Sequence, residues 1–168
     1  MQIMNKSTKE IKYKPIGIIH SPFKEPKGTP IQTTAAKGIE GAVEIFPKYA
    51  KGLKDIEGFS HIILIYHFHR SKGCSLKVKP FLDDELRGVF ATRSPSRPNP
   101  IGISIVRLER VEGNILHIKD IDIIDQTPIL DIKPYVPKID SKKAERIGWL
   151  KKKSRKFSNS EDDGRFTE

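Results

Sequence analysis

The sequence predicts an all-β (mainly β) fold, either a barrel or a sandwich, with one or two short helices. Its apolar residues gather in short runs of strand length that are rich in β-branched and aromatic side chains. Twelve prolines and twelve glycines in 168 residues interrupt the chain between these runs. No long stretch repeats its apolar residues with the 3.6-residue period of an amphipathic helix. Many short strands joined by tight turns are typical of β-barrels and β-sandwiches.

Three strands are predicted in the first half of the chain. Residues 15–20 form a short apolar run that ends at a loop, residues 21–30, with three prolines. Residues 41–46 alternate between apolar and polar side chains, as in a strand with one buried face. Residues 59–69 are almost continuously apolar, which indicates a central strand buried on both faces. Residues 49–58, between these two strands, have room for one helical turn.

The middle of the chain predicts a second group of strands. Residues 75–79 alternate and predict a short edge strand, and residues 89–91 are typical of the end of a buried strand. Residues 101–108 alternate again and predict the next strand. One face of that strand carries Ile101, Ile103 and Ile105.

The last part of the β region contains a hairpin and a final strand. The sequence Glu-Gly-Asn at residues 112–114 is a tight hairpin signal. The apolar residues of the returning strand, residues 115–124, change face near residues 119–120, which a bulge explains. Residues 129–135 predict the final strand, and residues 141–156 have helical character.

Length and charge suggest one domain with a basic end. We expect a flexible lead-in over residues 1–14, a β domain over residues 15–140 and a basic helix or tail over residues 141–168. The net charge is +10, and residues 142–156 hold eight Lys or Arg against one acid. This balance favours a polyanionic partner such as RNA, DNA or an anionic membrane face. The alternative is a basic tail that only improves solubility.

Several common classes are excluded by missing motifs. Cys74 is the only cysteine, so an internal disulfide and a multi-cysteine zinc site are excluded. The five histidines are scattered, and we expect no metal site. The glycine-rich nucleotide-binding motifs and the Gly-x-Ser-x-Gly hydrolase motif do not occur. Residues 62–66, the longest apolar run, are too short to span a bilayer, and the start of the chain lacks a signal stretch. We therefore expect a soluble cytoplasmic protein.

The loop between the strands at residues 89–91 and 101–108 has unusual chemistry. It contains three prolines, which fix their own φ angle and hold the preceding residue extended. Arg93 and Arg97 are thus carried on a stiff frame, as in a preorganised clamp for an anion. The alternative is a surface loop with solvated arginines. Because residues 21–30 form a similar loop, we expect both loops to line one site.

Two further groups are candidates for the site. His67 and His69 share a face at the end of the central strand, where they reach a ligand or form ordinary hydrogen bonds at the rim of the core. Asp122 and Asp125 follow the returning strand beside a turn. Their carboxylates are able to accept hydrogen bonds from a ligand or to pair with the loop arginines. The alternative is a solvated or capped turn.

The stiff loop Thr-Arg-Ser-Pro-Ser-Arg-Pro-Asn-Pro-Ile-Gly, residues 92–102, resembles the signature of the TsaA-like family, also called YaeB or TrmO. Residues 16–24, 58–61 and 122–135 agree with the same family in order and spacing. The resemblance implies a single-sheeted β-barrel, usually a homodimer, that binds S-adenosyl-L-methionine. Bacterial members are tRNA (adenine(37)-N6)-methyltransferases that methylate N6 of threonylcarbamoyl-adenosine, forming m6t6A.

The resemblance also implies roles for particular residues. Ile103 belongs to the apolar wall of the donor site, residues 101–104. Arg97 or Arg93 binds the carboxylate of the donor or of the threonyl group. The chemistry of the reaction, rather than the resemblance, suggests Asp125 and Asp131 as the proton acceptors. The donor-binding residues implied by position are Pro30, Ile31, Gln32, His69, Arg70, Arg93, Ile103, Asp122, Ile123, Ile124 and Asp125.

Three functions remain open from the sequence. The first is a tRNA N6-methyltransferase that contacts the anticodon stem-loop through its basic tail. The second is a methyltransferase that uses the same donor site on a different substrate. The third is a non-catalytic RNA-binding β-barrel, although aromatic residues for base stacking are only 8% of the chain.

Overall fold

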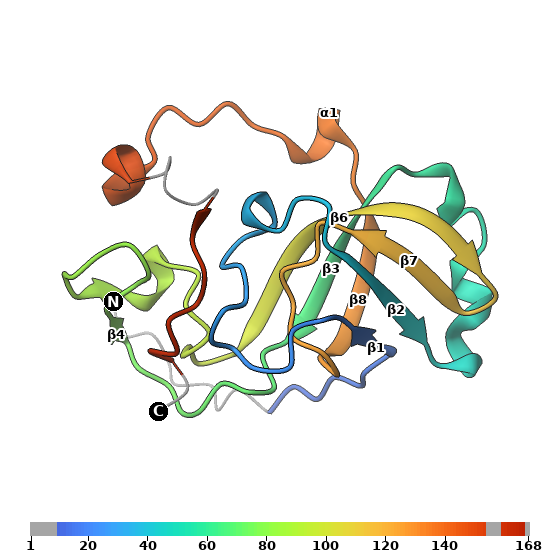
Figure 1. Cartoon of the computed structure of the whole chain (residues 1–168), viewed down its shortest axis with the longest axis horizontal. Helices are drawn as coiled ribbons and strands as arrows, with labels where there is room; N and C mark the ends of the chain where they lie inside the picture. The colour runs from blue at the N-terminus through green and yellow to red at the C-terminus, as the bar shows by residue number, and fades with distance from the viewer. Residues whose placement is uncertain (1–9, 154–158, 167–168) are drawn as a thin grey trace, which may run out of the picture.

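Six antiparallel strands close into one barrel in the computed structural model, which describes residues 10–153 and 159–166 (Figure 1). Neighbours around the barrel follow the order β1-β2-β7-β6-β3-β8. The predicted all-β barrel with short helices is thereby confirmed. The strands are β1 (Gly17–His20), β2 (Glu40–Ile45), β3 (His61–His67), β6 (Ile101–Glu112), β7 (Ile115–Lys119) and β8 (Pro128–Pro134).

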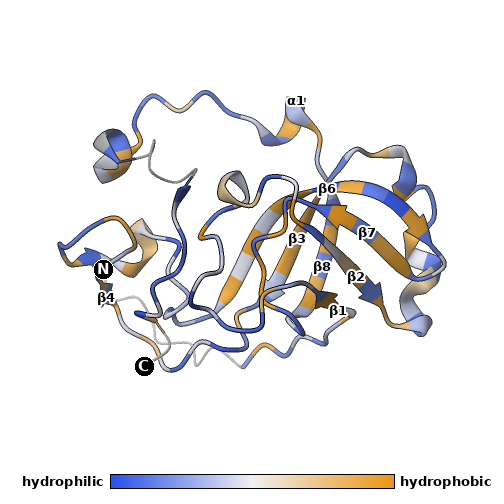
Figure 2. Cartoon of the chain, viewed as in Figure 1, coloured by the Kyte–Doolittle hydropathy of each residue, from blue (hydrophilic) through white to orange (hydrophobic). Residues whose placement is uncertain are grey.

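The core fills the barrel through strand alternation. Along β6, every second residue from Gly102 to Leu108 is buried and those between are exposed. Figure 2 shows the apolar residues concentrated on the barrel strands. A buried side chain of this kind contributes about 1.5–3 kcal/mol through burial. The fully buried large side chains are Ile19, Val43, Ile62, Leu64, Val89, Val106, Leu116, Ile118, Ile121 and Ile129.

Smaller elements connect and flank the strands. The helical turn expected over residues 49–58 is present as two 3-10 helices, η2 (Pro47–Leu53) and η3 (Ile56–Gly58). A two-stranded ribbon, β4 (Lys77–Val78) with β5 (Arg87–Gly88), lies outside the barrel. The other short elements are η1 (Thr33–Ala35), η4 (Val89–Ala91), α1 (Pro137–Asp140) and η5 (Gly148–Lys152). In the described ranges no helix is long and apolar enough to cross a membrane.

The prediction that residues 89–91 end a strand is wrong. They form the 3-10 helix η4, in which Val89 is buried and Phe90 is 76% exposed. The Thr92 hydroxyl donates a hydrogen bond back to the Val89 carbonyl at 2.8 Å and closes this turn. The edge strand expected over residues 75–79 shortens to β4, which pairs only with β5.

The returning strand is shorter than predicted. It ends as β7 at Lys119, because Asp120 adopts a left-handed conformation with φ of 66°. The Asp120 carboxylate accepts a hydrogen bond from the Gly38 amide at 2.7 Å, which fixes this exit from the sheet. The change of face at residues 119–120 is therefore a strand end, and the register shift lies on β6 between Leu108 and Arg110. The hairpin prediction is confirmed by Gly113, with φ of 62°.

The basic C-terminal region is less helical than its sequence indicates. Within residues 141–153 the structure contains only the 3-10 helix η5, which begins at Gly148 with φ of 57°. Part of the expected helix, residues 154–158, lies outside the described residues, as do residues 1–9 of the expected lead-in.

Candidate functional site

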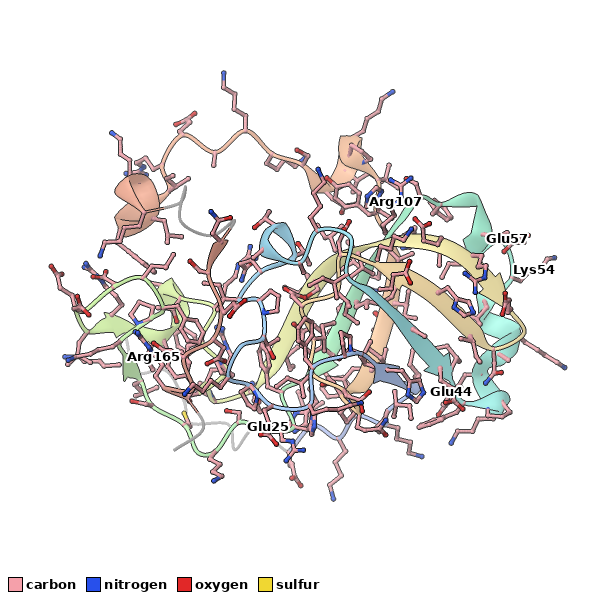
Figure 3. The ribbon with its side chains drawn as sticks, in the orientation of Figure 1. Glu25, Glu44, Lys54, Glu57, Arg107 and Arg165 are labelled. Atoms are coloured by element: carbon pink, nitrogen blue, oxygen red, sulfur yellow. The ribbon has the colours of Figure 1, made fainter. Side chains whose placement is uncertain are left out.

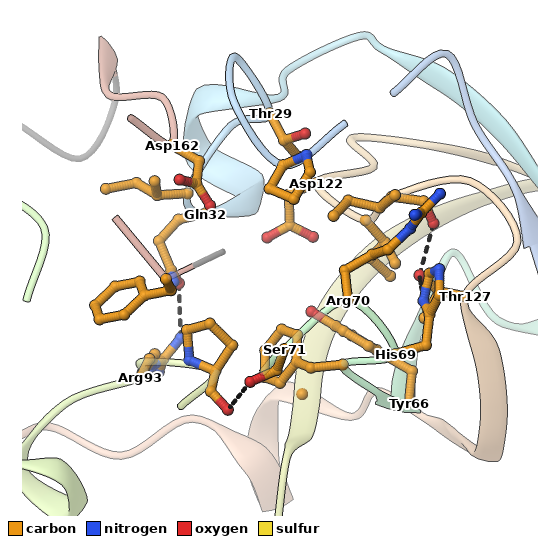
Figure 4. A pocket seen from close by; sticks show the side chains of 18 of the residues that line it. Thr29, Gln32, Tyr66, His69, Arg70, Ser71, Arg93, Asp122, Thr127 and Asp162 are labelled. Carbon is orange, nitrogen blue, oxygen red and sulfur yellow. Dashed lines mark hydrogen bonds between the residues drawn. The ribbon is translucent and has the colours of Figure 1, made fainter. Parts of the chain in front are cut away.

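A cavity of about 970 Å³, including its open mouth, lies where β3 ends and β6 begins (Figure 4). Both proline-rich loops line it, as the sequence predicts, and the C-terminal segment adds another wall. The lining residues that the sequence also predicts are Pro30, Ile31, Gln32, His69, Arg70, Arg93, Arg97, Ile103, Asp122, Ile123 and Ile124.

The cavity contains a buried polar chain formed by Asp122, Ser104 and Tyr66. The Ser104 hydroxyl donates to Asp122 Oδ1 at 2.6 Å, and Tyr66 Oη lies 3.1 Å from Ser104 Oγ. Burial raises the pKa of Asp122 to about 6, although the Ser104 hydrogen bond and the charge of Arg93 favour its ionised form. Burial also raises the pKa of Tyr66 well above its usual value. Near neutral pH these three residues thus present one carboxylate, that of Asp122, beside the neutral phenol of Tyr66.

His69 lies on another wall of the cavity and is neutral near pH 7. Burial lowers its pKa, and the nearby charges of Arg70 and His67 lower it further. The Thr127 hydroxyl donates to the Ile124 carbonyl at 2.7 Å, so it accepts at 3.2 Å from His69 Nδ1. His69 Nε2 is then the unprotonated ring nitrogen. His67, which the sequence indicates equally well, does not line the cavity.

The signature loop holds its arginines as the sequence predicts. Arg93 Nη1 donates to Gln32 Oε1 at 2.7 Å, which joins the two proline-rich loops. Arg97 Nη1 contacts two carbonyls of its own loop, those of Thr92 at 3.3 Å and Ser94 at 3.4 Å. Neither arginine forms an ion pair with an acid in the part of the chain that is described. Pairing of these arginines with Asp122 or Asp125, one of the alternatives above, is therefore wrong.

Asp125 lies beside the cavity, and its carboxylate is held by hydrogen bonds to the first proline-rich loop. It accepts hydrogen bonds from the Ser21 amide at 3.0 Å and from Lys24 Nζ at 2.6 Å. Partial burial acts to raise its pKa, but these two donors outweigh it and lower the pKa. Asp125 lines a neighbouring hollow with His20 and His117 and does not line the main cavity. Its side chain anchors the first proline-rich loop.

Asp131 does not belong to the site. It lies within β8, where its Oδ2 forms an ion pair with Lys133 Nζ at 2.7 Å and its side chain is half exposed. Asp131 is not among the residues that line the cavity. That Asp131 accepts a proton stays a prediction, and its position outside the cavity lining does not support it.

Some site residues were missed by the sequence analysis. Tyr66 and Ser104 are inward-facing polar residues in apolar strands, a signal that strand alternation alone reveals. Asp162 and Phe166 line the cavity from the C-terminal segment, for which the sequence contains no motif. Among the described residues, no three His, Cys, Asp or Glu side chains cluster as metal ligands.

Comparisons with known proteins agree with this architecture. A family model described as the tRNA-methyltransferase O N-terminal domain matches residues 18–141. A probable S-adenosyl-L-methionine-binding protein of Pyrococcus abyssi is 65% identical over 154 residues, covering 92% of this chain and 84% of that protein. The human tRNA (adenine(37)-N6)-methyltransferase is 39% identical over 134 residues, 76% of this chain but only 30% of the human protein.

A solved structure supports the same relationship. The crystal structure of TrmO from Pseudomonas aeruginosa superimposes with a TM-score of 0.70 and 38% identity, covering 83% of this chain and 62% of that chain. The chain therefore belongs to the tRNA-methyltransferase O (TrmO) family, as the resemblance of its signature loop implies.

Proposed function

We propose that this chain is an S-adenosyl-L-methionine-dependent methyltransferase that acts on N6 of threonylcarbamoyl-adenosine at position 37 of tRNA. The observation that carries the proposal is the cavity itself, which combines an apolar wall, fixed arginines and the carboxylate of Asp122 in a TrmO family domain. Relatives named as S-adenosyl-L-methionine-binding proteins and as tRNA (adenine(37)-N6)-methyltransferases support the donor and the acceptor base.

The residues in the cavity fit the methyl donor. Ile103, Ile123 and Ile124 offer apolar contact to its adenosine, and Gln32 offers hydrogen bonds beside them. Arg93, held by Gln32, is suited to a carboxylate. When bound, the donor supplies a methyl group already activated by its sulfonium. The protein's task is then to orient the two reactants and to exclude water.

Asp122 is the best-placed proton acceptor. The N6 nitrogen is a weak nucleophile and must lose a proton as the methyl group is transferred. Asp122 lines the cavity, and its pKa of about 6 leaves it ionised yet sufficiently basic at neutral pH. The Ser104 hydroxyl fixes one carboxylate oxygen at 2.6 Å and so orients the group. Asp125 is tied to Lys24, which makes it a weaker base than Asp122.

A homodimer is supported by an apolar row on the outer surface of the barrel. Ile101, Ile103 and Ile105 point outward from β6 and are 39%, 56% and 40% exposed. Adjacent apolar side chains on one strand face are unfavourable in water and favour a partner surface. Ile101 and Ile103 also line the cavity, so a second copy seated on this row would complete a wall of the site.

The proposed tRNA-binding surface consists of the basic C-terminal residues and extends from them toward the cavity. Lys142, Lys143 and Arg146 are exposed in the segment before η5. The segment is held beside the signature loop, because Trp149 Nε1 donates to the Ala91 carbonyl at 2.8 Å. Phosphates of an anticodon stem-loop are the expected partners of these cations.

Donor binding tests the enzyme class directly. S-adenosylmethionine at a hundred times its Kd should stabilise the folded protein by about 2.7 kcal/mol. A rise in the thermal midpoint of unfolding supports the methyltransferase, because a non-catalytic RNA-binding barrel has no use for the donor. An unchanged midpoint, together with no heat of binding in calorimetry, would contradict the proposal.

A further inference from the structure

The C-terminal strap, residues 159–166, runs along the first proline-rich loop and is paired with it. The Gly28 amide donates to the Asp162 carbonyl at 2.8 Å, and the Asp162 amide donates to the Thr29 carbonyl at 2.7 Å. The Ile31 amide donates to the Ser160 carbonyl at 3.1 Å, and Pro30 and Glu161 form an antiparallel bridge. The strap therefore holds the loop that carries Pro30, Ile31 and Gln32 into the cavity (Figure 1).

The end of the strap is anchored to the ribbon outside the barrel. Phe166 is buried, and its ring packs edge-to-face on Phe81 with 5.0 Å between the centroids. Arg165, labelled in Figure 3, donates to the Pro80 carbonyl at 2.8 Å and pairs with Asp163. These contacts fix the strap after Asp162, and the hydrogen bond to the Ser160 carbonyl fixes it before Asp162.

Two strap side chains, Asp162 and Phe166, line the cavity. The family model ends at residue 141, so these residues lie outside the conserved family domain as that model delimits it. The Gly164 amide donates to Asp162 Oδ1 at 2.7 Å and orients the carboxylate. Burial raises the pKa of Asp162, a cost that a cationic ligand group would offset.

The arrangement of charges indicates which ligand group faces Asp162. Asp162, Gln32 and Arg93 follow one another along one side of the cavity, and Asp122 lies beyond them toward Tyr66 (Figure 4). The methionine part of the donor carries an ammonium and a carboxylate on the same carbon atom. A paired anion and cation on one wall match such an amino acid. The threonylcarbamoyl group has a carboxylate but no ammonium.

We propose that Asp162 binds the α-ammonium of the methyl donor while Arg93 binds its α-carboxylate, so that the C-terminal strap completes the donor site. This inference rests on the proposed function, because it takes S-adenosylmethionine as the ligand. It assigns a donor-binding role to a residue outside the family domain.

Calorimetry with two ligands tests the assignment. S-adenosylmethionine contains the amino acid part and a sulfonium. The compound 5′-methylthioadenosine contains the same adenosine, with a neutral thioether in place of the sulfonium and without the amino acid part. Asp162→Asn should weaken S-adenosylmethionine binding by about tenfold, the usual cost of one charge-assisted contact. Its binding of 5′-methylthioadenosine should stay within about twofold of wild type. Glu161→Gln is the matched control, because Glu161 is an exposed neighbour that does not line the cavity.

Each outcome decides the inference. Thermal unfolding of each variant first shows that the fold is retained. Wild-type affinity of Asp162→Asn for S-adenosylmethionine would overturn the proposal. An equal loss with both ligands would also overturn it and assign Asp162 to the ribose hydroxyls. If the wild-type protein binds neither ligand, the proposed function fails as well, a result distinct from failure of the strap assignment alone.

Discussion

The pH profile of methyl transfer should report the ionisation of Asp122. Burial raises the pKa of this carboxyl to about 6, and a proton acceptor works only in its ionised form. Activity should therefore be lost as the pH falls through this pKa. One pH unit below it, about one tenth of the enzyme keeps an ionised Asp122, so the rate at pH 5 should be about one tenth of its plateau. The plateau should begin near pH 7.

Two variants assign this inflection to a residue. Ser104→Ala removes the hydrogen bond that favours the ionised carboxylate, so the inflection should move to higher pH. Asp122→Asn keeps the size of the side chain and should lower kcat by about 10²–10⁴-fold, the usual contribution of a general base. Asp125→Asn is the comparison, and its inflection should stay near that of wild type because the pKa of Asp125 is lowered in the fold.

The assay measures incorporation of labelled methyl groups into tRNA under single-turnover conditions between pH 5 and pH 8. Donor binding of Asp122→Asn, followed by calorimetry, controls for collapse of the cavity. A flat wild-type profile over this range would refute the assignment. Full activity of Asp122→Asn would refute it equally.

Three further predictions follow from the surfaces and packing. Ile103→Lys places a charge in the exposed isoleucine row and should convert a dimer into monomers, as measured by light scattering, whereas an unchanged mass would refute the interface. Gly102→Ala brings a Cβ into the Tyr66 ring and within 2.8 Å of Phe68, so it should lower the free energy of unfolding by about 1–3 kcal/mol in chemical denaturation. Gly58→Ala is the control and should not show this loss, because a Cβ at Gly58 meets no atom within 4 Å. Reversing three basic charges before η5 should weaken tRNA binding and reduce its dependence on salt. The matched control reverses three basic charges around η2, at the opposite end of the molecule (Figure 3). Equal effects of the two triple variants would contradict the proposed surface. The test triple is Lys142, Lys143 and Arg146 to Glu, and the control triple is Lys48, Lys51 and Lys54 to Glu.

The barrel strands could be predicted from the sequence because each strand is marked by the pattern of its own apolar residues. Residues 101–108 alternate strictly, and the structure buries every second side chain of β6 from Gly102 to Leu108. The near-continuous apolar run at residues 59–69 likewise predicts β3, which pairs on both sides within the barrel. Proline spacing in residues 92–100 predicts a stiff loop, and the loop indeed carries Arg93 to the cavity.

The choice among carboxylates could not be made from the sequence. Asp122, Asp125 and Asp131 each directly follow an apolar residue. The positions of Asp122 and Asp125 follow the end of β7, where Asp120 adopts a left-handed conformation and contacts the distant Gly38. A single backbone conformation thus separates the carboxyl that lines the cavity from the one that anchors a loop.

The strap could not be predicted for a different reason. It is joined to residues 28–31 by backbone hydrogen bonds, which require no particular side chains and so have no sequence signature. Similarly, the 3-10 helix η4 is closed by two hydrogen bonds to the Val89 carbonyl, from the Thr92 amide at 3.1 Å and from the Thr92 hydroxyl at 2.8 Å. Such contacts form only after folding has brought distant segments together or has fixed a side chain in one rotamer.

The most direct test of the central claim is the identity of the methylated nucleoside. The protein is incubated with labelled S-adenosylmethionine and threonine tRNA that carries the threonylcarbamoyl group but lacks the methyl group, and the digested nucleosides are then separated. Label is expected on N6 of threonylcarbamoyl-adenosine and none in tRNA without that group. Label on another nucleoside would keep the methyltransferase but contradict the substrate, and no label despite donor binding would contradict the proposed reaction on this tRNA.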